Sequence, residues 1–222
     1  MNFFIIFMSL ILGLETSSQN CSVALFDDAK ILVSKKNNEI YKHSQILFPM
    51  IQNVLKEADV EVKKLDAIAI SSGPGSFTGL RIGSAAALGM CHALEIPLIA
   101  INTLESLIST VKNNYHEDIL FCPMIDARRM EVYCMISDNQ NNVVLQQQAK
   151  IIDEDSFKEF DKKILCFGDG ATKCKKVLQN NNKIQFLDGI DTEADNLCKI
   201  AYVRFQKKIF DNILTFSPNY IK

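Results

Sequence analysis

The chain has 222 residues, 48% of them hydrophobic, which is enough for a sizeable core in one or two domains. Its 24 basic and 26 acidic side chains give a net charge of −2, so it lacks the basic excess of proteins that hold nucleic acid by themselves. Seven scattered cysteines without a CxxC pair argue against a disulfide framework or a cysteine zinc site, and we expect reduced core thiols in a cytoplasmic protein.

The N-terminal run MNFFIIFMSLILGL is apolar, but it lacks the positive region and the cleavage site of a secretory signal. It is also shorter than the roughly 20 apolar residues that a membrane helix needs, so we expect no membrane contact. Residues 9–14 are almost all apolar and predict a strand buried on both faces. Met8 is an alternative start to Met1.

Strands at 22–26 and 31–34 flank a short polar break, so the chain is expected to open with three antiparallel strands. Apolar residues at spacings of three and four predict a helix over 44–58, in which Pro49 causes a kink or shifts the start to about Phe48. A strand at 66–70, a helix at 80–94 and a strand at 97–101 follow. Asn102 and Glu105 form a variant capping box that starts a third helix.

This order, βββαβαβα, predicts an α/β lobe with a mixed sheet and helices on its faces. The second half predicts strands at 121–126, 131–137, 143–147 and 164–167 and a helix at 195–209. We place the boundary between two lobes near residue 103. The first lobe is then 1–103 and the second 104–222, with the last helix free to pack back on the first lobe.

The glycine-rich loop between the strand at 66–70 and the next helix is a candidate nucleotide or anion loop. Its candidate residues are Gly73, Gly75, Ser76, Thr78 and Gly79. The loop lacks the Lys-Ser/Thr ending of a P-loop, and the alternative is a tight turn that needs glycine for positive φ. Arg81, one turn into the helix, would serve an anion or a partner's carboxylate.

The helix at 80–94 has small residues on one face, at Gly79, Gly83 and Ala86. Each glycine weakens a helix by about 0.8–1.0 kcal/mol relative to alanine, so their presence requires a reason. Packing on the chain's own sheet and a subunit interface are both open explanations.

Other catalytic or metal patterns are weak. The three histidines have no metal-ligand spacing, and no serine has a histidine nearby in sequence. Asp126, Arg128, Arg129 and Glu131 form a charge cluster at a strand turn, either solvated surface or an interface.

Several separated segments together resemble the TsaB family of threonylcarbamoyladenosine biosynthesis proteins. They are LETSSQNCSVAL, HSQILFPMIQNVL, AIAISSGPGSFTGLRIGSAAALGM, PLIAINTLESL, MIDARRMEVY and SPNYIK. The resemblance implies an actin-like ATPase (ASKHA) fold with two related lobes, each a mixed sheet flanked by helices. It also implies a non-catalytic subunit needed to form threonylcarbamoyl on the tRNA adenosine next to the anticodon.

The resemblance further implies what this chain lacks. Its paralogue TsaD holds a metal through two histidines, and the matching positions here are Thr103 and Leu107, which are poor ligands. The superfamily's Asp-Gly-Thr phosphate loop is replaced by Glu15-Thr16-Ser17. We therefore expect no metal and no cofactor of its own, with ATP or ADP bound only in an assembled complex.

By resemblance, the chain pairs with TsaD through the helices at 44–58 and 80–94, and it acts with the ATPase TsaE and the synthase TsaC. The residues expected at that interface are Ile46, Leu47, Met50, Val54, Arg81, Gly83, Ala86, Ala87 and Met90. On this basis Ala86→Arg would prevent pairing. A homodimer is the alternative pairing, and tRNA would be reached only through the complex. Alternative functions are a small-molecule kinase or phosphotransferase of the same superfamily, a metallopeptidase-like enzyme, and a self-associating protein with no tRNA role.

Overall fold

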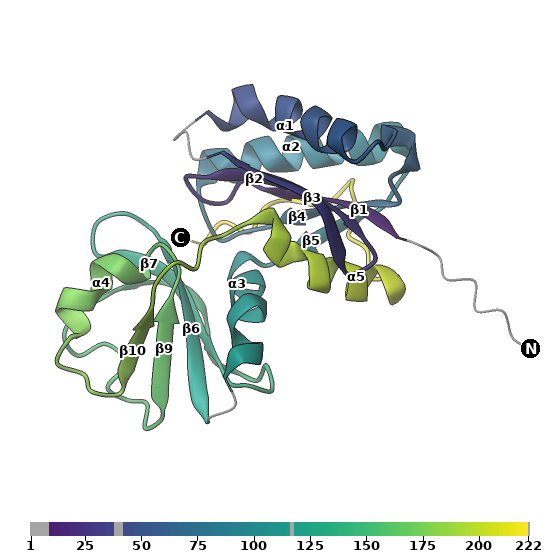
Figure 1. Ribbon diagram of the computed structural model, residues 1–222. Coiled ribbons are helices and arrows are strands. Elements are labelled where there is room, and N and C mark those ends of the chain that lie inside the picture. The colour runs from purple at the N-terminus through teal and green to yellow at the C-terminus, as the bar shows by residue number, and fades with distance from the viewer. Residues whose placement is uncertain (1–8, 38–41, 116–117, 222) are drawn as a thin grey trace, which may run out of the picture.

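The computed structural model describes residues 9–37, 42–115 and 118–221. Two five-stranded sheets form two lobes, with helix α3 (Thr103–Val111) lying between them (Figure 1). The start at Met1 or Met8 lies outside the described residues. In the described part of the chain, no helix combines the length and the apolar character needed to cross a membrane.

The first sheet follows the predicted opening of three antiparallel strands. Its strands are β1 (Leu10–Glu15), β2 (Cys21–Asp27), β3 (Lys30–Asn37), β4 (Ala67–Ser71) and β5 (Leu98–Ile101), in the order β3-β2-β1-β4-β5. β1 pairs antiparallel with β2 and parallel with β4, and β4 is parallel to β5. The carboxyl ends of β1 and β4 therefore lie together at one edge of the sheet.

Helix α1 (His43–Glu57) begins before Pro49, so the predicted alternative of a start near Phe48 is wrong. Proline removes the amide that would bond the carbonyl four residues earlier, here that of Gln45. Pro49 and Gln45 are both exposed, so water can satisfy that carbonyl. A short 3₁₀ turn (Val62–Lys64) then leads into β4.

Side-chain caps fix where the next two helices begin. Ser76 caps α2 (Phe77–Leu94), and its hydroxyl accepts from the amide of Gly79 at 3.3 Å. Asn102 caps α3, accepting from the amides of Leu104 at 2.9 Å and Glu105 at 3.2 Å, which confirms the predicted start of that helix. A 3₁₀ turn (Lys112–Asn114) continues α3.

The second sheet repeats the connectivity of the first. Its strands are β6 (Ile119–Asp126), β7 (Glu131–Ser137), β8 (Val143–Ile151), β9 (Lys163–Phe167) and β10 (Ile184–Leu187), in the order β10-β9-β6-β7-β8. As in the first sheet, three antiparallel strands precede two parallel ones. The four predicted strands are confirmed, whereas β10 and the short helix α4 (Ala171–Leu178) were not predicted.

The helix predicted at 195–209 is divided and shorter. A 3₁₀ turn (Ala194–Leu197) leads into α5 (Cys198–Gln206), and Lys208 has φ +54°, a left-handed conformation that ends the helix. Ala194, Leu197 and Ala201 pack on the first sheet with Ile11 and Phe26, while α1 and α2 cover its opposite face (Figure 1). The division of the chain at residue 103 stays a prediction.

All seven cysteines are free and buried, as the sequence predicted. Burial raises the pKa of the Cys21 and Cys91 thiols to about 12, so they remain protonated at neutral pH.

Candidate functional site

The glycine-rich loop lies against the turn that follows β1, where the superfamily's first phosphate loop is expected. The amide of Ser76 donates to the carbonyl of Ser17 at 2.6 Å. A Cβ added at Gly75 or Gly79 would collide with the carbonyl oxygen of Ser17 or Thr16. The glycines are therefore explained by the close approach of two backbone segments. Whether the loop also binds a nucleotide or an anion stays a prediction.

Two other glycines have similar explanations. Gly73 has φ +105°, and a Cβ there would meet the carbonyl of Asn219 in the C-terminal segment. Gly83 lies one turn beyond Gly79, against the side chain of Thr16. The structure thus gives α2 a glycine-lined contact with the turn at 16–17.

A cleft of about 510 Å³ lies between the lobes beside this loop. The first turn of α2, with Phe77 and Thr78 exposed, forms part of one wall. The turn between β6 and β7 faces it with Asp126 and Arg128, and Asp169 adds a second carboxylate. The charge cluster predicted from sequence thus lies partly in this cleft.

The cleft lining carries mixed charge. The Asp126 carboxylate accepts from the Lys173 ammonium at 2.5 Å and from the Arg128 amide at 2.7 Å. The Asp169 carboxylate accepts from the Asp126 amide at 3.0 Å. The Asp126 and Asp169 carboxylates balance the Arg128 guanidinium and the Lys173 ammonium, so this cluster has no excess of positive charge.

Glu15 ends β1 below the cleft, and its carboxylate is fully buried. One oxygen accepts from the Ser17 amide at 2.6 Å, and the other accepts from the Ser71 hydroxyl at the end of β4. Burial raises the pKa of this carboxyl, although hydrogen bonds from Ser17 and Ser71 oppose the shift. Both of its oxygens therefore accept hydrogen bonds from within the protein.

We expect Glu15→Gln to remove a pH dependence of stability. An acid whose pKa is raised by folding stabilises the native state fully below its unfolded pKa, near 4.5, and loses that contribution as pH rises through the folded value. Between pH 5 and pH 8 the wild type should thus lose stability relative to Glu15→Gln in urea unfolding. Glu159→Gln, at an exposed position, is the matched control. Parallel curves for wild type and Glu15→Gln would contradict the assignment.

The positions matching the paralogue's metal histidines lie in the core. Thr103 and Leu107 on α3 are both fully buried. The His43 ring bonds the carbonyl of Asn20 at 3.1 Å, and His92 is exposed, while His116 lies outside the described residues. Within the described ranges, no three His, Cys, Asp or Glu side chains cluster as metal ligands would.

Most residues predicted at a partner interface pack inside the first lobe. The buried ones are Leu47, Met50, Val54, Gly83, Ala86 and Ala87. Packing on the chain's own sheet, one of the two explanations left open for α2, accounts for Gly83, Ala86 and Ala87. Ile46 and Met90 are half-buried and Arg81 is exposed, and the partner-facing role of the whole set stays a prediction. Ala86 is 6% exposed, so Ala86→Arg would disturb the fold as well as any interface.

The exposed side of the helix pair carries residues that the sequence analysis did not select. On α2, exposed positions recur at four-residue spacing: Phe77, Arg81, Ala85 and Gly89. Nothing lies within 4 Å of a Cβ placed at Gly89, and Phe48 on α1 is 53% exposed. Small residues on an open helix face allow a second helix to approach closely, since the distance between packed helices depends on the contacting side chains. We call the surface formed by Phe77, Arg81, Ala85 and Gly89 the α2 ridge.

Residues 31–222 match the sequence family described as "TsaD: tRNA N6-adenosine threonylcarbamoyltransferase". The chain is 30% identical over 175 residues to the tRNA threonylcarbamoyladenosine biosynthesis protein TsaB of Bacillus subtilis (strain 168), covering 77% of this chain and 75% of the relative. It is 32% identical over 175 residues to TsaB of Buchnera aphidicola subsp. Schizaphis graminum (strain Sg), covering 75% and 81%. The chain belongs to the TsaB family.

The solved structure of YeaZ from Pseudomonas aeruginosa agrees with this assignment. It superposes on the TsaB-family chain with a TM-score of 0.80 at 26% identity, covering 96% of this chain and all of the other. The predicted actin-like ATPase (ASKHA) fold is confirmed, as is the family that the sequence segments indicated. A role in the biosynthesis of threonylcarbamoyladenosine on tRNA follows from membership of the family.

Proposed function

We propose that this chain is a non-catalytic subunit that pairs with the transferase TsaD. In that role it is required for forming threonylcarbamoyl on the tRNA adenosine next to the anticodon. The proposal rests on membership of the TsaB family together with one structural observation. Glu15 accepts hydrogen bonds from Ser17 and Ser71, and the glycine loop lies against the turn at 16–17.

The residues at the two candidate catalytic places support the absence of catalysis. Thr103 and Leu107 are buried and poor metal ligands, so a metal-dependent transfer or a metallopeptidase reaction has no centre at that place. A kinase of the same superfamily would need the first phosphate loop, and there the Ser17 carbonyl already accepts from Ser76. We propose that the chain has no cofactor of its own and that ATP or ADP binds only in the assembled complex.

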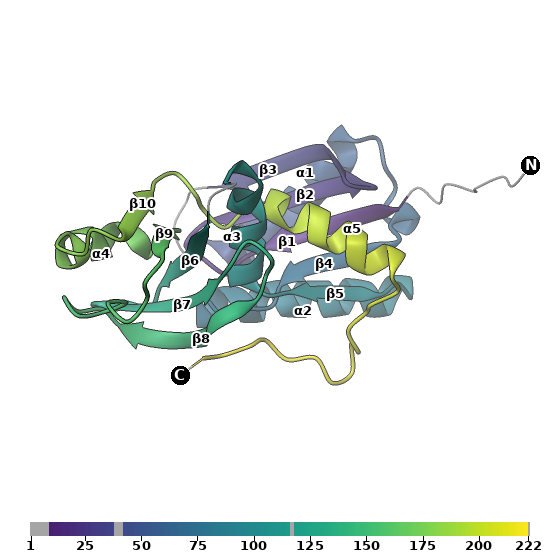
Figure 2. The same ribbon diagram turned by 90° about the horizontal axis from the view of Figure 1, so that it is seen from below.

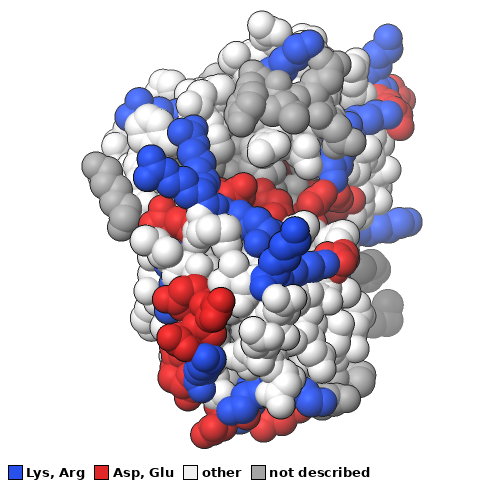
Figure 3. All heavy atoms as spheres, turned by 90° about the vertical axis from the view of Figure 1, so that its left-hand side faces the viewer, with Lys and Arg blue, Asp and Glu red and all other residues white. Residues whose placement is uncertain are grey.

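The α2 ridge is the surface that we propose for TsaD. TsaE and the synthase TsaC would act with the assembled pair, and a homodimer would compete for the same ridge. On the face in Figure 3, basic side chains form a broken band with acidic side chains beside it. Much of the affinity for nucleic acid comes from basic side chains that contact phosphates, and acidic neighbours weaken such contacts. The mixed pattern therefore supports a role in which tRNA is bound by the assembled complex and not by this chain alone. Seven buried free thiols fit a reducing, cytoplasmic location.

Reconstitution tests the proposal directly. Purified synthase, TsaD and TsaE are mixed with tRNA, threonine, bicarbonate and ATP, with and without this chain, and modified adenosine is measured. We expect modification only when the chain is present, and no turnover by the chain alone. Equal modification without it would refute the subunit role and favour the kinase alternative.

A further inference from the structure

The C-terminal segment, residues 211–221, runs along the first lobe from the edge of β5 to the start of α2 (Figure 2). We call it the strap. The Asp211 amide donates to the Leu98 carbonyl at 2.9 Å, and the Asp211 carboxylate accepts from the Ala100 amide at 2.7 Å. β5 is the last strand of its sheet, so Asp211 pairs with polar groups on its edge, where the Arg204 guanidinium also donates to the Ala100 carbonyl.

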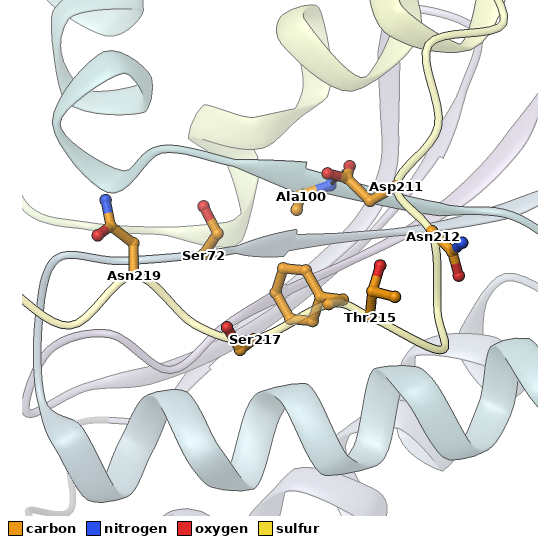
Figure 4. A pocket seen from close by; sticks show the side chains of 8 residues that line it. Ser72, Ala100, Asp211, Asn212, Thr215, Ser217 and Asn219 are labelled. Carbon is orange, nitrogen blue, oxygen red and sulfur yellow. Dashed lines mark hydrogen bonds between the residues drawn. The ribbon is translucent and has the colours of Figure 1, made fainter.

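The other end of the strap is held near the glycine loop. The Asn219 amide donates to the Ser72 carbonyl at 2.7 Å. Figure 4 shows Asp211 beside Ala100 at one end of this stretch and Asn219 near Ser72 at the other. Between them, Ile213 and Phe216 pack against the core shared by α1 and α2. The strap is thus fixed at both ends and in the middle.

This anchoring places Tyr220 on the first turn of α2. The Tyr220 and Phe77 rings lie 4.8 Å apart, centroid to centroid, and the Arg81 guanidinium carbon lies 4.0 Å from the Phe77 centroid. Phe77 is 53% and Tyr220 38% exposed, so the two rings cover each other only in part. Arg81 makes no ion pair with a described residue, which leaves its charge available to a carboxylate.

Tyr220, Phe77 and Arg81 form a stack at the N-terminal end of the α2 ridge, with which it shares Phe77 and Arg81. Phe77 and Arg81 precede Ala85 at four-residue spacing, so they lie on the same side of the helix. Aromatic and arginine side chains are enriched among the residues that dominate binding energy in protein interfaces. A partner on the ridge would therefore meet this stack at the N-terminal end of α2.

We propose that the strap is part of the partner surface and that Tyr220, Phe77 and Arg81 anchor the transferase subunit. This inference rests on the proposed function. The fitting partner surface is a helix pair with a carboxylate opposite Arg81 and an apolar side chain against the two rings. A transferase fits because the stack adjoins the rest of the α2 ridge, the surface on which the proposed function places that subunit.

The test measures the affinity of the purified chain for purified transferase by calorimetry. Tyr220→Ala is expected to weaken binding tenfold or more, as loss of an interface anchor does. Arg81→Gln should weaken it about tenfold and reduce the salt dependence of binding. Leu214→Ala, on the same strap and 88% exposed, is the matched control and should leave the affinity unchanged. Thermal unfolding of each variant identifies any loss of folded protein.

The outcomes separate the two proposals. If the wild type does not bind the transferase, the proposed function fails and this inference fails with it. If the wild type binds and a folded Tyr220→Ala keeps its affinity, only the strap inference is overturned, whatever the effect of Arg81→Gln. Should Tyr220→Ala unfold, Tyr220→Leu, which keeps an apolar side chain at this position of the strap, replaces it. A variant that dissociates a dimer of this chain but keeps its transferase affinity would also overturn the inference.

Discussion

Ala85→Arg is expected to weaken binding to the transferase at least about a hundredfold, close to 2.7 kcal/mol, while the chain stays folded. Ala85 is exposed on α2, one turn from both Arg81 and Gly89, at the middle of the α2 ridge. A long cationic side chain there would hold two helices apart and place a charge in a closed contact without a partner. Calorimetric titration with the transferase and the reconstituted modification assay both measure this loss.

Ala29→Arg provides the matched control for that experiment. Ala29 is exposed in the turn between β2 and β3, outside α1 and α2, so the same change of side chain should leave the affinity unaltered. Ala86→Arg is less suitable because Ala86 belongs to the core. A folded Ala85→Arg protein with wild-type affinity would remove α2 from the interface.

Gly79→Ala should lower the free energy of unfolding by about 3 kcal/mol or more, since both atoms of the clash are held by backbone. The added Cβ would collide with the carbonyl oxygen of Thr16, a residue that is 2% exposed. Urea unfolding of the isolated variant, followed by circular dichroism, measures the change.

Gly89→Ala is the opposite case on the same helix. Nothing lies within 4 Å of a Cβ placed at Gly89, so alanine should raise the free energy of unfolding by about 0.4–1 kcal/mol through its higher helix propensity.

Equal stability of Gly79→Ala and wild type would mean that the contact with the turn at 16–17 does not require glycine at position 79. A ligand-binding reason for the loop would then need to be considered again.

Local signals in the sequence were sufficient for most of the fold. The first lobe's βββαβαβα order follows from apolar periodicity and from caps such as Asn102, which act over a few residues. α4 and β10 were missed because both are short and α4 carries several lysines. The helix predicted at 195–209 ends early because Lys208 adopts a left-handed conformation. Glycine or asparagine usually occupies such a position, so a lysine there does not predict the end of a helix.

The candidate site required the tertiary structure. An apolar stripe shows which side of a helix is buried, so it selected Leu47 and Val54, which pack in the core. The surface left for a partner is the opposite side, where Ala85 and Gly89 have no distinctive pattern of their own.

The sequence by itself determined the family and the two-lobed α/β architecture, because these depend on residue identity and local spacing. Only the tertiary structure showed that Gly75 and Gly79 lie against the turn at 16–17 and that Glu15 accepts hydrogen bonds from Ser17 and Ser71. It alone also placed Tyr220 on Phe77. The physical reason is that these contacts join segments far apart along the chain, and their geometry is fixed by how β1, β4, α2 and the strap pack together.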